Sequence, residues 1–112
     1  MTKYALYVRL EAKPGKEQEV AAFLSSAAAL VNREPETTAW FAIKMSANIF
    51  GIFDAFPSEQ GREAHLNGEV AKQLMAKASE LLAKPPEIHK IDVLADKLPH
   101  EPRSVGSSSR GA

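Results

Sequence analysis

The pattern of apolar and polar positions predicts a strand and then a helix at the start of the chain. Side chains alternate in polarity over residues 3–12 (KYALYVRLEA), which is typical of a strand. A turn at Lys13-Pro14-Gly15 ends this alternation. Residues from about 15 to 32 then repeat their apolar side chains every three or four positions, so they predict an amphipathic helix.

The middle of the chain predicts a hairpin. Residues 37–45 (TTAWFAIKM) and 49–56 (IFGIFDAF) are rich in aromatic and β-branched side chains, which favour strands. Only residues 46–48 separate them, and so short a link implies that the two strands are antiparallel.

A second helical stretch begins after Pro57, with Ser58 suited to cap its first turn. Asn67-Gly68 interrupts it, and Gly68 is expected to take the left-handed conformation that ends a helix. The apolar stripe then resumes and runs to about residue 83. Lys84-Pro85-Pro86 stops the helix, and residues 87–95 (EIHKIDVLA) predict a fourth strand.

The predicted order, β-α-β-β-α-β, indicates the α+β class and a ferredoxin-like antiparallel sheet with its helices on one face. Residues 1–98 are expected to form a single domain. Residues 99–112, which end in GSSSRGA, have the composition of a flexible C-terminal tail.

One face of such a sheet has no helix over it, and strand alternation suggests which residues lie there. The polar and apolar residues expected on this open face are Tyr7, Arg9, Trp40, Ala42, Lys44, Asn48, Phe50, Ile52, Asp54 and Phe56. Those expected to face the helices are Leu6, Val8, Leu10, Phe41, Ile43, Met45, Ile49, Gly51, Phe53 and Ala55. An aromatic surface of this kind favours association with a second copy. Its polar minority is typical of a small-molecule pocket, although a dimer interface without a pocket is the alternative.

Composition excludes several kinds of function. Lys plus Arg equal Asp plus Glu at 14 each, so the net charge is zero and a nucleic-acid partner is not expected. The absence of cysteine excludes disulfides, zinc–thiolate sites and thiol nucleophiles. The N-terminus reaches charged residues too soon for a signal peptide, and no apolar run is long enough to span a membrane, so the cytoplasm is the expected compartment. No metal-ligand spacing or nucleotide-binding motif is present.

Four residues expected on or near the open face have side chains that could bind a ligand or take part in catalysis. His65 turns towards the sheet if the helix breaks at Asn67-Gly68; otherwise it is a partly exposed histidine near a helix end. Trp40 can stack on an aromatic ligand and donate one hydrogen bond, or simply pack in a dimer interface. Asn48 and Arg9 can stabilise an oxyanion. The alternatives are a hairpin-turn role for Asn48 and, for Arg9, a cross-strand ion pair with Glu11 or Asp54.

Several segments together resemble the antibiotic biosynthesis monooxygenase family, within the dimeric α+β barrel superfamily. They are the KPGK turn (13–16), the hairpin with Trp40, IFGIFDAFPSEQGREAHL (49–66) and PPEIHKIDVLADKLP (85–99), and the likeness covers residues 3 to about 98. A histidine in the short helix after the third strand recurs in this family, and His65 stands there.

The resemblance implies a homodimer whose two sheets face each other as a barrel. It also implies a monooxygenase that oxidises a small phenol, hydroquinone or enol with molecular oxygen and needs no cofactor. In that role His65 is the base or substrate anchor, while Asn48 and Arg9 stabilise the substrate anion. Trp40 and Tyr7 form pocket walls, and Phe50 and Asp54 complete the substrate-binding residues.

Two other functions stay open at this stage. One is a dimer that binds a small molecule without turning it over. The other is a heme protein with His65 as the iron ligand, and it has less support because nothing else in the sequence indicates a heme pocket. The pKa values limit the monooxygenase hypothesis. A phenol of pKa about 10 and a histidine of pKa about 6.5 differ by roughly 3.5 units, so proton transfer from one to the other costs roughly 5 kcal/mol. The pocket must therefore also stabilise the phenolate.

Overall fold

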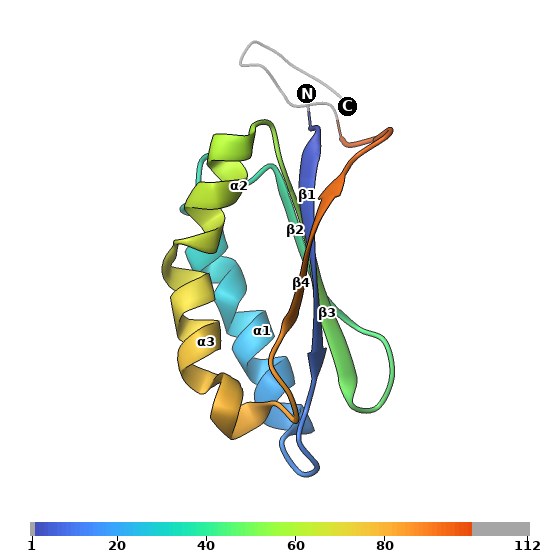
Figure 1. Ribbon diagram of the computed structural model, residues 1–112, viewed down its shortest axis with the longest axis vertical. Coiled ribbons are helices and arrows are strands. Elements are labelled where there is room, and N and C mark those ends of the chain that lie inside the picture. Colours follow the sequence, from blue (N-terminus) through green and yellow to red (C-terminus); the bar gives the residue numbers. More distant parts are fainter. Residues whose placement is uncertain (1, 100–112) are drawn as a thin grey trace.

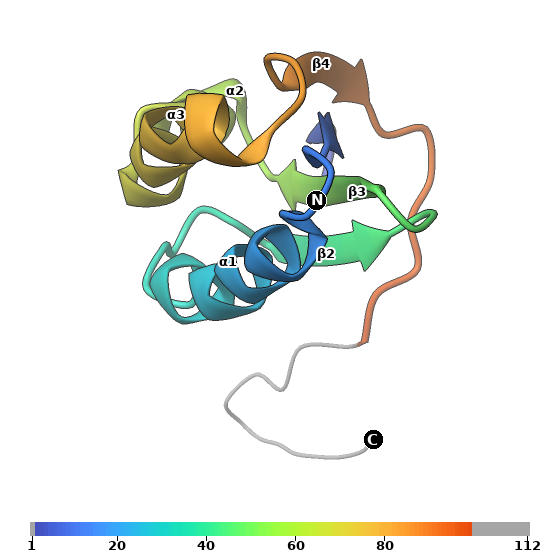
Figure 2. The ribbon, with the colours of Figure 1, turned by 90° about the horizontal axis from the view of Figure 1, so that it is seen from below.

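The computed structural model of the chain describes residues 2–99 and has the predicted order of strands and helices. The single sheet is antiparallel throughout, with strand order β2-β3-β1-β4, and all helices lie on one face of it (Figures 1 and 2). The ferredoxin-like α+β fold is therefore confirmed. Its elements are β1 (Tyr4–Glu11), α1 (Glu17–Val31), β2 (Ala39–Lys44), β3 (Ile49–Phe56), α2 (Glu59–Leu66), α3 (Glu69–Leu81) and β4 (Glu87–Asp92).

The C-terminal tail predicted from composition lies, apart from Pro99, outside the described residues. Within residues 2–99 no helix is both long enough and apolar enough to cross a membrane.

The core lies between the sheet and the helices, as the alternation in β1 predicts. Leu6, Val8 and Leu10 are buried on the helix side. Val8 and Leu10 belong to a hydrophobic cluster to which α1 contributes Val20 and Leu24. The opposite face of β1 carries Tyr7 and Arg9, which are only partly buried. The assignment of faces in the first strand is thus correct.

In β2 and β3 the predicted faces are reversed. The register aligns Leu6, Asp54 and Trp40 across three strands, and directly opposed residues share a face, so Trp40 and Asp54 lie under the helices. Phe50, Ile52 and Phe56 are buried in the core on the same side rather than on the open face. The open face instead presents the residues that had been assigned to the helix side, namely Phe41, Ile43, Ile49, Gly51 and Phe53, with Met45 just beyond β2.

The reversal has a physical cause. The strand IFGIFDAF is apolar at nearly every position, so its alternation gives no indication of which face is buried. Gly51 had been expected to admit a helix; a Cβ there would instead lie 3.2 Å from the Tyr7 ring and 3.3 Å from Ile43, both on the open face.

The predicted helix break is present, because α2 ends at Leu66 and α3 starts at Glu69. Ser58 caps α2 as expected, its hydroxyl oxygen accepting a hydrogen bond from the Gly61 N–H at 3.0 Å. Gly68 is not left-handed: its φ of −89° and ψ of −173° make it the extended N-cap of α3. Arg62 fastens α2 to the sheet, since its Nη1 donates to the carbonyls of Ala5 (3.3 Å) and Ile91 (3.2 Å).

Candidate active site

A buried histidine between two carboxylates is the centre of the candidate site. Nδ1 of His65 lies 2.6 Å from Oε1 of Glu34, and Nε2 lies 2.9 Å from Oδ2 of Asp54. The His65 side chain is 8% exposed and that of Asp54 is 1% exposed, whereas Glu34 is 23% exposed. The three residues therefore form a line of hydrogen bonds from the interior to the surface.

Three separate elements bring these side chains together. Asp54 comes from β3, on the face that the helices cover, and His65 from the last turn of the short helix α2. Glu34 comes from the connection between α1 and β2, where the Thr37 hydroxyl donates to the same oxygen, Oε1, at 2.8 Å. The Phe56 ring lies 5.4 Å from the imidazole and tilted to it, so the histidine is fixed by packing as well as by polar contacts.

Gly61 lets the connection carrying Glu34 approach α2 closely. A Cβ at Gly61 would lie 3.0 Å from the Glu36 Cβ and 3.3 Å from the Glu36 carbonyl oxygen. The Asn67-Gly68 break also matters here, because it lets α2 end with the imidazole pointing at β3. His65 thus points at the helix-covered face of the sheet, and the expectation that it points at the open face is wrong.

The electrostatics of this line favour bound protons. Burial lowers the pKa of His65, but hydrogen bonds to Asp54 and Glu34 and the charges of both carboxylates outweigh it, so the pKa lies above its ordinary value of 6.5. Burial raises the pKa of Asp54 above 3.8, and its hydrogen bond to His65 offsets this only in part. An imidazole can donate from both nitrogens only as the imidazolium, so a proton bound at His65 lets the ring donate to Asp54 and to Glu34 at once.

A cleft of about 700 Å³ opens beside the exposed end of this line. Glu34, Glu36 and Thr37 form one wall, and Gly61, His65 and Gly68 belong to the opposite wall. This volume suits a small organic molecule. A proton given up by such a molecule would reach Glu34 first, because Glu34 is the more exposed partner of His65.

Trp40 lies on the helix side near the same connection. Its ring packs against core residues of α1 and α3, including Leu24, Val31 and Val70. It also lines a smaller hollow of about 220 Å³ together with Glu34 and Thr37. The structure therefore places Trp40 near the candidate site, but between sheet and helices and not on the open face.

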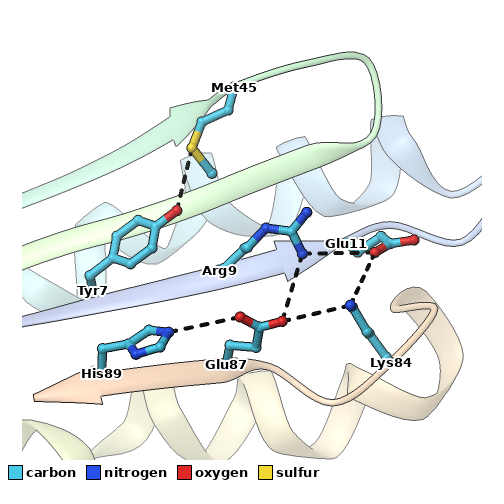
Figure 3. Close-up of polar contacts among 7 residues, drawn as sticks. All are labelled: Tyr7, Arg9, Glu11, Met45, Lys84, Glu87 and His89. Atoms are coloured by element: carbon cyan, nitrogen blue, oxygen red, sulfur yellow. Dashed lines mark hydrogen bonds and ion pairs between the residues drawn. The ribbon is translucent and has the colours of Figure 1, made fainter.

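Two of the predicted site residues lie on the open face. Tyr7 and Arg9 are on the open face, where Tyr7 stacks on His89 at 6.0 Å, and Arg9 Nη1 lies 3.8 Å from both Glu11 and Glu87 (Figure 3). Of the two partners considered for Arg9, Glu11 is within ion-pair distance but lies on the same strand, and Asp54 is on the other face of the sheet. The cross-strand partner is Glu87, which was not predicted. The sheet separates Tyr7 and Arg9 from His65 of the same chain.

Asn48 lies in the turn between β2 and β3, where its carbonyl accepts from the Ala12 N–H at 2.9 Å. Six residues of extended strand separate it from Asp54, which is about 20 Å. Asn48 therefore does not meet His65 within one chain, and its turn role is the one observed. Phe50, another predicted substrate contact, is a core residue with 2% exposure.

Sequence reasoning missed Glu34 and Thr37, because a loop residue that contacts another 31 positions away leaves no periodic signal. Asp54 was recognisable in another way, because it is the only charged residue within IFGIFDAF. A carboxylate inside an apolar strand needs a partner, and this could have identified Asp54 and His65 as a pair.

Comparison with known proteins identifies the fold and one close relative. No family model and no curated protein matches the sequence. Among solved structures, NE2512 from Nitrosomonas europaea, a protein of unknown function, is 58% identical with a TM-score of 0.89, over 90% of this chain and 98% of that one. Rv0793 from Mycobacterium tuberculosis is 16% identical with a TM-score of 0.75, over 84% of this chain and 97% of that one.

A structure described as an antibiotic biosynthesis monooxygenase matches at a TM-score of 0.71 and 13% identity, over 82% of this chain and 99% of that one. At this identity the likeness concerns the fold, whereas the likeness to NE2512 extends to the sequence. The chain therefore belongs to the same family as NE2512, and it has the fold of the antibiotic biosynthesis monooxygenases.

Proposed function

We propose that the protein is a cofactor-independent monooxygenase that oxidises a small phenol, hydroquinone or enol in the cleft beside Glu34 and His65. The observation that carries this proposal is the Asp54–His65–Glu34 line ending at a cleft of ligand size. The fold shared with antibiotic biosynthesis monooxygenases supports the same chemistry. Asn48 and Arg9 have no part in it within one chain.

The residues in the line act on the substrate proton. Glu34 receives the proton from the substrate hydroxyl at the cleft. The proton then passes to Nδ1 of His65 through the 2.6 Å contact between that atom and Oε1 of Glu34. Because the pKa of His65 is raised, its neutral form is a stronger base than an ordinary imidazole. The cost of roughly 5 kcal/mol for deprotonating a phenol is reduced accordingly.

The oxidation itself balances without a further reagent. The substrate anion transfers one electron to molecular oxygen. The resulting substrate radical and superoxide join in a carbon–oxygen bond, and the peroxide anion takes back the proton that the Glu34–His65 pair had accepted, which gives a hydroperoxide. Loss of water from that hydroperoxide leaves a carbonyl, so one oxygen atom enters the quinone product and the other leaves as water. The role of the chain's own residues is to form the anion and to enclose it.

Oxygen uptake with a panel of phenols and hydroquinones tests the proposal. Glu34→Gln and His65→Gln should each reduce the rate by about 10²- to 10⁴-fold, the usual contribution of a general base. His89→Gln is the matched control, because His89 lies across the sheet on the open face. Equal rates for wild type and His65→Gln would exclude the proposed base.

A second candidate is binding without turnover, and one observation favours it. Both ring nitrogens of His65 are already hydrogen-bonded, as expected of a structural histidine. In that case phenols would quench Trp40 fluorescence but produce no oxygen uptake. Heme ligation by His65 would require one of these two bonds to break, so the geometry does not favour it.

The working form is proposed to be a homodimer that covers the open face. Phe41, Ile43 and Met45 are 39–55% exposed there, next to Tyr7 and Phe53. Apolar side chains gathered in this way favour burial against a second surface.

A further inference from the structure

Two buried polar atoms beside the candidate site have no hydrogen-bond partner among residues 2–99. They are the indole nitrogen Nε1 of Trp40 and the carboxylate oxygen Oδ1 of Asp54. Buried polar groups in folded proteins nearly always have a partner, and an orphan usually marks a bound water or ligand atom.

The two residues that carry these atoms are neighbours by the register of the sheet. Trp40 and Asp54 are directly opposed in the β2–β3 pair and lie on the same, helix-covered face. Opposed residues of antiparallel strands have Cβ atoms about 4.5–5.5 Å apart. No direct hydrogen bond joins the two side chains in the described structure, although the indole N–H lacks an acceptor and the carboxylate oxygen lacks a donor.

The chemistry of the pair is complementary. An indole N–H can only donate, and a carboxylate oxygen bonded to a histidine through its other oxygen can accept. A hydroxyl group does both at once, because its oxygen accepts one hydrogen bond while its proton is donated to another atom. A lone anion or an ammonium group would satisfy only one of the two.

We propose that a hydroxyl group bridges Trp40 and Asp54, accepting from the indole N–H and donating to Oδ1. Its source is either one buried water or the hydroxyl of a phenol that reaches Trp40 through the hollow of about 220 Å³. Neither source is the substrate hydroxyl of the proposed function, which lies at Glu34 in the larger cleft, so the bridge does not rest on that proposal. In both cases the bridge extends the hydrogen-bonded line from Trp40 through Asp54 and His65 to Glu34.

The chain's single tryptophan makes this site directly observable. Full-length protein labelled with ¹⁵N gives one indole N–H resonance, and Trp40→Phe identifies it by its loss. In the free protein we expect a nuclear Overhauser contact between that proton and a bound water. Asp54→Leu, which removes the acceptor, should abolish the contact, whereas Asp54→Asn, which keeps an acceptor oxygen, should retain it.

Adding phenol separates the two sources. A water contact that persists at saturating phenol assigns the bridge to a buried water. Replacement of that contact by one to phenol, with a shifted indole resonance, assigns it to the hydroxyl of a phenol bound in the hollow. An indole proton with no contact to water in the free protein and none to phenol overturns the proposal, even if the Asp54 variants fail to fold. Failure of the monooxygenase proposal would appear separately, as absent oxygen uptake with the water contact intact.

Discussion

Nδ1 of His65 and Oε1 of Glu34 lie 2.6 Å apart although 31 positions separate the two residues in the sequence. This contact ties the short helix α2 to the connection between α1 and β2. It also links a nearly buried imidazole to a carboxylate on the wall of the cleft. Stability and acid–base behaviour should therefore change together when either residue is replaced.

His65→Leu should lower the free energy of unfolding by about 3–5 kcal/mol, because it leaves Asp54 buried without its charge partner. The double variant His65→Leu/Asp54→Leu should be more stable than the single one, since it removes both charges. Urea unfolding followed by circular dichroism measures both. His89→Leu, at a half-exposed position, should change stability by at most about 0.5 kcal/mol. A double variant less stable than the single would contradict the pairing.

Stability should fall as the pH rises above about 6.5. The pKa values of His65 and Asp54 are both raised in the folded protein, so the folded state binds more protons than the unfolded state. The contribution of His65 to the free energy of unfolding is complete below pH 6.5 and is lost as the pH rises through the raised pKa of the folded state. The contribution of Asp54 begins to be lost above pH 3.8. The difference in unfolding free energy between wild type and His65→Gln, measured from pH 5 to 9, should shrink along this range. A difference that grows with pH would show the opposite sign of linkage.

Catalysis should show the reverse dependence. The base must be unprotonated, so kcat/KM for a phenol should increase as the pH rises through the raised pKa of His65. Replacing Asp54 by Asn removes a negative charge next to the imidazole and should move this limb to lower pH. Oxygen-electrode rates over pH 5–9 give the profile, and a limb that stays in place in Asp54→Asn would rule out the coupling.

Gly61→Ala should destabilise the protein by about 1–2 kcal/mol, although alanine is the better helix former. The new Cβ would lie 3.0 Å from the Glu36 Cβ and 3.3 Å from the Glu36 carbonyl oxygen, so the connection carrying Glu34 must move. Gln60→Ala, at the neighbouring exposed position of α2, is the control and should be nearly neutral. Greater stability in Gly61→Ala would mean that the connection yields without cost.

Phe41→Lys should dissociate the proposed dimer, since it puts a charge on the apolar open face. Met75→Lys is a matched control, because Met75 is also 55% exposed but lies on α3, away from that face. Sedimentation velocity at micromolar concentration distinguishes the two species. If both variants sediment like the wild type, the open face is not the interface.

The fold was predictable because each element carries a local signal. The alternation of β1, the stripe of α1 and the cap at Ser58 all act within a few residues. The faces of β2 and β3 were not predictable in this way, since a strand that is apolar on both sides has no polar residue to mark solvent. Trp40 and Asp54 were consequently assigned to the wrong side of the sheet.

The candidate site was only half predictable. His65 and Asp54 were identified, but as parts of an open-face pocket, and Arg9 and Asn48 were grouped with them although the fold holds them apart. Glu34 could not be found because its partner is set by how a loop packs on α2. The glycine that permits this packing, Gly61, could not be assigned a role from the sequence before that contact was known.

The strand order β2-β3-β1-β4 also has a consequence for how the molecule is made. β1 is synthesised first, yet it occupies an inner position and pairs with β3 and with β4, the last strand to be synthesised. Its second edge stays unpaired until residues 87–92 have left the ribosome. Pairings between such distant segments form slowly, because a long loop must close before they contribute. The sheet is therefore completed only after residues 87–92 have been synthesised, and a nascent chain that stops before β4 exposes an inner strand with one edge open.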